Sequence, residues 1–176
     1  MRPLAEAQSD VLDALPFLDE VEVGVGEALG LALRREVAAP HDVPPFPNSA
    51  MDGFAVLATD VAETPVELRV LEDVPAGSVP TQAVVAGAAI KIMTGAPMPA
   101  GANSVVKVED TEPVGNGAVR ILSGAALGEN VRPAGGDLVA GSPVFAIGTR
   151  LGPAHLGVLA SLGVAPVVGR RLVVAG

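Results

Sequence analysis

Apolar and polar residues alternate over several short stretches of the chain, and this period of two predicts β-strands. The alternation is regular in residues 65–71, where Pro75-Ala76-Gly77 then marks a turn. Val21 and Val23 alternate with glutamates in the same way. Further strands are predicted at residues 88–93, 105–108, 119–121 and 143–147, with one or two more in 164–175. The fold class that these patterns predict is mainly β with a few short helices, a β-rich α+β fold.

Helical spacing occurs near both ends of the sequence. Residues 1–18 carry apolar side chains on one face of a predicted helix, and a proline ends the pattern. The apolar positions are Leu4, Ala7, Val11 and Leu15, and the proline is Pro16. Residues 153–162 form the second predicted helix, with a proline at its first position and Gly163 as its stop. Residues 26–29 predict a single helical turn, and 31–38 fit either a strand or a short helix.

Turn residues separate these elements. Asn116-Gly117 between two short strand patterns predicts a β-hairpin. Two loops rich in proline and glycine are predicted at residues 39–49 and 94–103, because proline fixes φ and removes backbone donors. Gly135-Gly136-Asp137 predicts a tight turn.

The composition agrees with a fold of short strands. Hydrophobic residues make up 49% of the 176 residues but aromatic residues only 2%, so the core is built from Val, Leu, Ala and Ile. Glycine (21) and proline (16) are scattered, which favours tight turns over long helices. The chain has no cysteine, which excludes disulfides, thiolate metal ligands and cysteine nucleophiles.

The formal charge of −9 opposes binding to nucleic acid, which is itself a polyanion, and no run of Lys or Arg offers a local exception. No apolar run reaches the length of a membrane helix, and the first residues are too acidic for a signal peptide. From the sequence we therefore expect a cytoplasmic protein that binds neither nucleic acid nor membrane.

Several segments match a known sequence motif only in part. Residues 24–30 place the third glycine of a dinucleotide fingerprint one position too late, and residues 95–101 lack the Lys-Ser/Thr of a P-loop. His41 and His155 are the only histidines and lie far apart in sequence, so packing or solvent exposure explains them better than a metal site. No nucleophile elbow is present.

Three loops carry candidate chemistry. In residues 44–55 prolines stiffen the approach, and Asp52-Gly53 predicts a turn that presents a carboxylate, a ligand type that Mg²⁺ prefers. In residues 91–102 a predicted strand delivers Thr94 to a glycine turn, where its hydroxyl can donate and accept. In residues 130–138 Arg132 can bind an anion through two parallel hydrogen bonds. Taken from the residues alone, each loop is better explained as an ordinary closing turn or a surface ion pair than as a functional site.

Together these loops resemble the N-terminal region, domains I and II, of the MoeA (molybdopterin molybdotransferase) family, which is related to the gephyrin E domain. The Ser-Ala-Met-Asp-Gly-Phe-Ala segment at 49–55, the Ile-Met-Thr-Gly-Ala-Pro segment at 92–97 and the Asn-x-Arg…Gly-x-Asp element at 130–137 occur in the family's order. The similarity extends over most of the chain, from about residue 15 to 174.

The resemblance implies a function in molybdenum cofactor biosynthesis. The family inserts molybdenum from molybdate into adenylylated molybdopterin with release of AMP. The resemblance also implies Mg²⁺ as a cofactor, but it does not identify the residues that bind the ion. Residue by residue, the resemblance implies catalytic roles for Asp52, Thr94 and Asp137. It implies substrate binding by Ser49, Gly95 and Arg132. Pro133, Ala134 and Gly136 stand where relatives often carry basic residues and a glutamate, so anion contact near Asp137 is expected to be weaker.

The resemblance also implies an organisation in two lobes. A discontinuous dimerisation lobe would comprise residues 1–40 and 140–176, and a β-rich lobe with the active-site loops would comprise 41–139. The family forms homodimers, and its pterin-binding domain lies beyond the segment represented here. The chain alone is therefore expected to be inactive. The alternatives are a non-catalytic dimerisation or scaffolding module of the gephyrin type and an unrelated β-rich domain.

Overall fold

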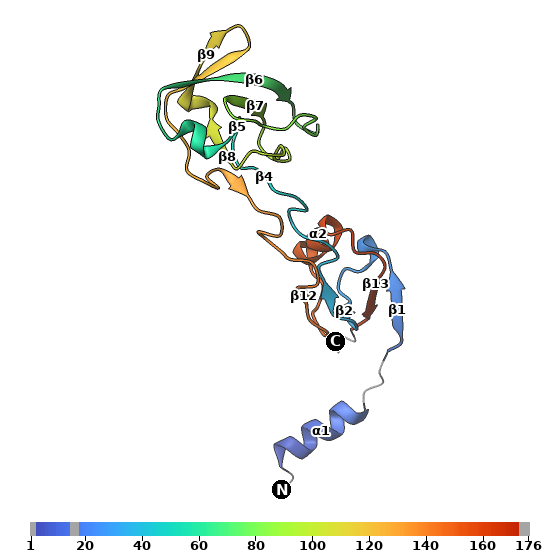
Figure 1. Ribbon diagram of the computed structural model, residues 1–176. Coiled ribbons are helices and arrows are strands. Elements are labelled where there is room, and N and C mark those ends of the chain that lie inside the picture. Colours follow the sequence, from blue (N-terminus) through green and yellow to red (C-terminus); the bar gives the residue numbers. More distant parts are fainter. Residues whose placement is uncertain (1–2, 15–17, 173–176) are drawn as a thin grey trace. The chain divides into compact units, whose positions relative to one another are not determined.

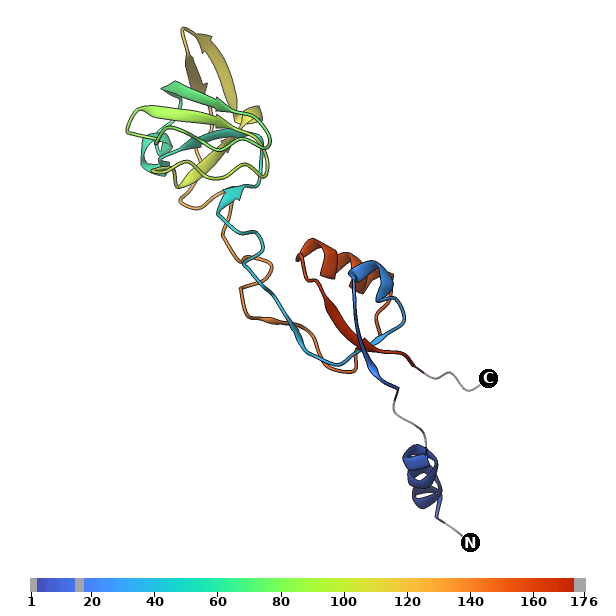
Figure 2. The same ribbon diagram turned by 90° about the vertical axis from the view of Figure 1, so that its right-hand side faces the viewer.

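The computed structural model describes residues 3–14 and 18–172, and these fall into two compact units (Figures 1 and 2). One unit combines residues 1–40 with 141–176, and the other is the continuous segment 41–140. The structure confirms a mainly β fold with two α-helices. The dimerisation role expected of the first unit remains a prediction.

A curled sheet of six strands forms the 41–140 unit, in the order β8-β5-β7-β6-β10-β9. Its strands are β5 (Gly53–Val56), β6 (Val66–Val74), β7 (Ala88–Ile92), β8 (Ser104–Lys107), β9 (Thr111–Gly115) and β10 (Ala118–Ile121). All neighbours pair antiparallel except β6 and β7, which are parallel. Short 3₁₀ turns, η2 (Ala58–Val61) and η3 (Val108–Asp110), lie at its edges.

The sheet buries apolar side chains on both faces. Phe54, Val56 and Val106 belong to one cluster of buried side chains, and Ala55, Ile90 and Val105 belong to a second. Because successive strand residues point to opposite faces, one strand such as β5 serves both clusters. The loops that connect these strands are therefore attached to a sheet whose side chains are packed on both faces.

The first unit has a small three-stranded sheet in the order β1-β13-β2, with a separate strand pair β12-β3. Its strands are β1 (Glu20–Val23), β2 (Ala32–Leu33), β3 (Val37–Ala38), β12 (Pro143–Phe145) and β13 (Val167–Arg170). The helix α2 (Pro153–Ser161) and the 3₁₀ turn η1 (Val25–Glu27) complete it. Leu33, Leu151 and Leu159 lie in its buried core, at 1% exposure or less.

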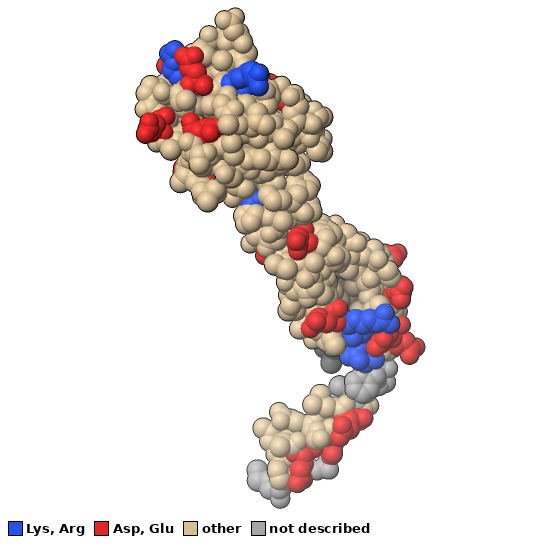
Figure 3. Space-filling model, in the orientation of Figure 1, with Lys and Arg blue, Asp and Glu red and all other residues tan. Residues whose placement is uncertain are grey.

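The helix α1 (Leu4–Ala14) has no buried residue. Its acidic side chains, Glu6, Asp10 and Asp13, are spaced for one face, and Figure 3 shows acidic groups along one side of the helix. Leu4, Val11 and Leu12 are strongly exposed. The helix is confirmed over 4–14, whereas Leu15 and the predicted stop at Pro16 lie outside the described residues.

Most predicted elements are confirmed. The hairpin between β9 and β10 turns at Asn116 and Gly117, which have φ values of 50° and 71°, as a type I′ turn requires. The helix α2 is followed by Gly163 at φ 67°. The segment 31–38 forms neither a single strand nor a helix, because its two short strands pair with different partners, β13 and β12. Residues 164–172 hold one strand, and residues 173–176 lie outside the described ranges.

Candidate functional site

Asp52 and Thr94 form a hydrogen-bonded pair in the 41–140 unit. Asp52 directly precedes β5, and Thr94 follows the end of β7, with which β5 pairs antiparallel. One carboxylate oxygen, Asp52 Oδ1, accepts a bond from the backbone N–H of Thr94 at 2.7 Å and one from its hydroxyl at 2.6 Å. Both residues are exposed. The sheet thus joins two of the three predicted catalytic residues, which lie 42 positions apart in sequence.

The same two bonds keep Asp52 ionised. The hydroxyl of Thr94, and to a smaller extent its backbone N–H, lowers the pKa of Asp52 below its ordinary value of 3.8, and desolvation opposes the shift. Hydrogen bonds to the charged form of a carboxyl favour that form. At neutral pH the site therefore presents a fixed negative charge, and the second oxygen, Oδ2, has no hydrogen-bond partner among the described residues.

A tight turn orients Thr94. The N–H of Ala96 donates to the Met93 carbonyl at 3.0 Å, and Gly95 has a φ of 82°, which a type II turn needs at this position. The N–H of Gly95 donates to the Ser49 carbonyl at 2.8 Å, and Ser49 N–H donates to the Ala96 carbonyl at 3.0 Å. Gly95 therefore shapes the turn and ties it to the Asp52 loop.

Ser49 is fully buried, and its hydroxyl is used within its own loop. It donates to the Met51 carbonyl and accepts a bond from the Met51 N–H at 3.2 Å. This arrangement gives Ser49 a part in fixing the approach to Asp52. The substrate contact expected from the resemblance stays a prediction.

The turn predicted at Asp52-Gly53 is wrong in one respect. Gly53 is the first residue of β5 and lies between β7 and β8. A Cβ at this position would lie 2.0 Å from the Val106 carbonyl oxygen. The glycine is therefore required by a close approach of two backbones, and Asp52 is held at a strand end, where its carbonyl accepts the Val108 N–H at 3.0 Å.

The beginning of the third loop joins the same assembly. The short strand β11 (Val131–Arg132) pairs antiparallel with β4 (Asn48–Ser49), with Arg132 opposite Asn48. Asn130, at φ 58°, accepts the Ala50 N–H with its carbonyl and donates to the Val105 carbonyl with its side chain. Sequence analysis gave Asn130 no such role, although its place in the Asn-x-Arg element and the tolerance of Asn for left-handed φ were available signals.

Arg132 and Asp137 are both exposed. The N–H of Asp137 donates to the Val43 carbonyl at 2.9 Å. No hydrogen bond or ion pair within residues 3–14 and 18–172 joins Asp137 to Asp52 or Thr94. The turn predicted at 135–137 lies slightly earlier, at 133–136, where Gly135 has a φ of 67°.

The histidines serve local structure. His155 Nδ1 accepts the Gly152 N–H at 3.0 Å at the start of α2, and its ring contacts Phe145 edge-on at 5.0 Å. His41 Nδ1 lies 3.0 Å from the Asp42 carbonyl. Among the described residues no group of three or more His, Cys, Asp or Glu side chains could hold a metal ion.

Asp52 is a single carboxylate of the kind that Mg²⁺ accepts, and it is the residue on which the proposed Mg²⁺ site is tested. Mg²⁺ commonly binds through one or two carboxylates, retaining waters and substrate phosphates as its other ligands. The ionised, exposed carboxylate of Asp52 meets this requirement. Among the candidate site residues, Asp52 has chemistry that is compatible with such an ion.

The fold and this loop assembly define the class of protein. Residues 2–163 match the family model described as the MoeA N-terminal region (domain I and II), and the chain belongs to the MoeA family. A crystal structure of a molybdopterin biosynthesis MoeA protein from Pyrococcus horikoshii OT3 superposes with a TM-score of 0.87 and 34% identity, over 97% of this chain and 46% of that one.

Named relatives are similar in sequence as well. Molybdopterin molybdenumtransferase 2 of Mycobacterium tuberculosis is 40% identical over 179 residues, covering 98% of this chain and 44% of the relative. Molybdopterin molybdenumtransferase of Synechococcus elongatus is 43% identical over 136 residues, covering 74% of this chain and 34% of the relative. The chain thus spans less than half the length of these relatives. Within the described part of the chain, no helix combines the length and apolar character needed to cross a membrane.

Proposed function

We propose that the chain is the N-terminal part of a molybdopterin molybdotransferase and contributes the Asp52–Thr94 pair to a composite active site. The reaction would insert molybdenum from molybdate into adenylylated molybdopterin and release AMP. Family membership and the names of the relatives support the pathway. The observation that carries the site is the exposed carboxylate that Thr94 fixes with two short hydrogen bonds.

The residues of this chain have distinct parts in the proposed reaction. Asp52 presents a negative charge whose direction is fixed by Thr94, with Oδ2 available to a cation. Mg²⁺, when bound, supplies positive charge against the oxygens of the anionic substrates. Gly95 and Ser49 hold the two loops in register through paired backbone bonds. Since the chain has a net charge of −9, the main anion contacts are assigned to the part of the relatives that it does not span.

The roles of two residues and the assembly rest on the resemblance alone. Arg132 is proposed as an anion contact, and Asp137 as the third functional residue and, after Asp52, the second functional carboxylate. A homodimer is proposed as the working assembly, with the chain in the cytoplasm. By itself, the chain is proposed to have no turnover.

The test is a chimera in which residues 1–163 replace the matching region of the M. tuberculosis relative. We expect molybdate-dependent AMP release from adenylylated molybdopterin. Thr94→Val should reduce it about 10- to 100-fold, as loss of a group that orients a metal ligand does. Asp52→Asn should reduce it further. Glu63→Gln, which removes the charge of an exposed carboxylate that has no side-chain partner among the described residues, is the matched control and should leave the rate unchanged.

Full activity of the Asp52→Asn chimera would contradict the proposed site. AMP release by the isolated 176-residue chain would contradict the proposal that its site is only part of an active site.

A further inference from the structure

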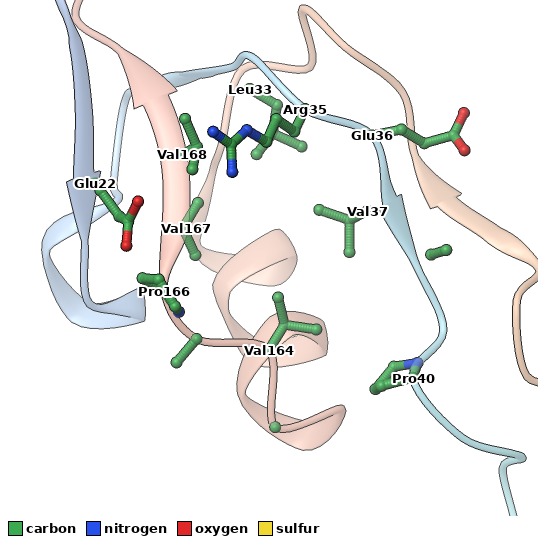
Figure 4. A pocket seen from close by; sticks show the side chains of 13 residues that line it. Glu22, Leu33, Arg35, Glu36, Val37, Pro40, Val164, Pro166, Val167 and Val168 are labelled. Atoms are coloured by element: carbon green, nitrogen blue, oxygen red, sulfur yellow. The ribbon is translucent and has the colours of Figure 1, made fainter.

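An open groove lies within the first unit, between β13 and β3 (Figure 4). Its volume is about 440 Å³. The chain enters β2 paired with β13, and the last contact of this pairing is the bond from the Arg34 N–H to the Val168 carbonyl at 3.1 Å. Beyond Arg34 the two segments separate, and β3 pairs with β12 instead. The groove is therefore a gap beside a strand edge.

The edge of β3 that borders the groove carries unpaired backbone groups. Ala39 is bonded towards β12, since its N–H donates to the Ser142 carbonyl and its carbonyl accepts the Gly141 N–H. Backbone groups alternate along a strand, so those of Ala38 and Glu36 point the opposite way, and both residues line the groove. Outside the pairing of β3 with β12, neither Ala38 nor Glu36 makes a backbone hydrogen bond with another described residue. An extended peptide can pair with such an edge.

The side chains of the groove are apolar at its base. Val37 points into the gap from β3, and Val167 borders it from β13 (Figure 4). They are 8% and 2% exposed, and Leu33 lies beside them at 1%. This floor suits an apolar side chain of moderate size, because every second residue of an added strand would face it.

The rim carries one cation that lacks a carboxylate partner. Arg35 is exposed, has no ion pair or side-chain hydrogen bond among the described residues, and directs its guanidinium across the mouth of the groove towards Val168 (Figure 4). Arg34, its neighbour, is already paired with Glu20 at 3.1 Å. Glu22 lines the groove from β1, and the carboxylate of Glu36 points away from it. A ligand in the groove would therefore complement Arg35 with an acidic group, and this group would lie away from the carboxylate of Glu22.

We propose that this groove binds an extended peptide segment of a partner protein. The segment pairs with the free edge of β3, packs an apolar side chain over Val37 and Val167, and places a carboxylate against Arg35. The occupant is thus a strand that alternates apolar residues with an acidic one.

The test uses the isotope-labelled chain and the synthetic peptide acetyl-Ser-Val-Glu-Val-Ser-amide. Saturable NMR shifts are expected at Val37, Ala38 and Val167. The peptide with Lys in place of Glu should bind about threefold to fivefold more weakly, the range of an exposed ion pair. A peptide methylated at every backbone nitrogen should lose binding about fivefold or more, because it cannot donate to the strand edge.

Reversing the charge of Arg35 distinguishes binding in this groove from nonspecific peptide binding. Arg35→Glu should invert the preference between the Glu and Lys peptides. Arg150→Glu makes the same charge change at an exposed arginine of this unit outside the groove and should leave the preference as it was.

Three results would overturn the proposal. The first is no saturable shift with the Glu peptide at millimolar concentration. The second is an unchanged preference in Arg35→Glu. The third is a shift of the same groove resonances on diluting the chain without peptide, which would assign the groove to a second copy of this chain.

Discussion

At the scale of single residues, the site depends on how Thr94 uses its two donors. Both reach the same oxygen of Asp52, so the carboxylate is held in one orientation while its other oxygen remains available. A carboxyl restrained in this way titrates at lower pH than a free one. Asp52 therefore reports directly on whether the two loops are assembled.

Replacing Thr94 by Val removes the hydroxyl bond and should raise the pKa of Asp52 towards its ordinary value. Because the folded pKa lies below that value, the ionised carboxylate contributes stability above the ordinary pKa, and this contribution is lost as the pH falls through the folded pKa. Carboxyl ¹³C NMR titration measures the shift. Thr81→Val, which disrupts another exposed threonine–carboxylate pair, with Glu72, is the control. An Asp52 pKa that is unchanged in Thr94→Val, or that moves equally in Thr81→Val, would contradict this account.

The pairing of Asp52 with Thr94 could not have been predicted from residue chemistry. Each loop alone is explained by an ordinary turn, and the contact depends on β5 pairing with β7 across a long sequence separation. Only the order of the three motifs indicated a common site. The place of Asp137 in that site stays a prediction, because its backbone N–H bonds to Val43 and no hydrogen bond among the described residues joins it to the pair.

At the scale of elements, local patterns predicted those whose partners are close in sequence. The alternation in residues 65–71, the Asn116-Gly117 turn and the capped helix at 153–162 each carry their own signal. The two-residue strands β4 and β11 were not predicted, and β2 and β3 were expected only as one strand or short helix over 31–38, since so short a segment has no period. Their pairing is fixed by distant strands instead.

Gly53→Ala tests the close approach of β5 and β8. We expect the free energy of unfolding to fall by about 3 kcal/mol, the upper range for overpacking, because the added Cβ meets a backbone carbonyl that cannot rotate away. Residue-resolved NMR during urea unfolding measures it from the amides of β5 and β7. The contact between Asp52 and Thr94 should weaken in the same variant.

Gly157→Ala is the opposite case. It lies within α2 with nothing within 4 Å of an added Cβ, so alanine should stabilise the helix by about 0.5–1 kcal/mol. If the Gly53→Ala variant has the same free energy of unfolding as the original chain, the steric explanation for Gly53 is wrong.

At the scale of the whole molecule, the 41–140 unit is an insertion in the other one. Its two ends are joined by reciprocal backbone bonds between Val43 and Leu138, at 2.8 and 3.1 Å, and by a bond from the Ala140 N–H to Asp42 Oδ1 at 2.8 Å. It has its own buried core on both faces of its sheet. All three candidate loops belong to this unit.

Residues 41–140 expressed alone should therefore fold cooperatively and keep the lowered pKa of Asp52. The expected evidence is dispersed amide NMR signals and a single unfolding transition. A segment of 41–130 removes β11 and the Val43–Leu138 closure and should be clearly less stable. Loss of the fold in 41–140 would show that the insertion needs its host. The host, with residues 40 and 141 joined by a short Gly-Ser linker, should also fold, because Ala39 already bonds to Gly141 and Ser142 across the junction.

The one-sided hydrogen bonding of Asp52 has a consequence for ion selectivity. With Oδ1 saturated by Thr94, the group can offer a cation a single oxygen and cannot chelate through both. Ca²⁺ often gains affinity from bidentate carboxylates in large, flexible coordination shells, whereas Mg²⁺ accepts one oxygen in an octahedron otherwise filled by water and phosphate. If Asp52 holds the proposed Mg²⁺, a threonine 42 positions away in sequence would therefore favour that ion over Ca²⁺ without contacting it.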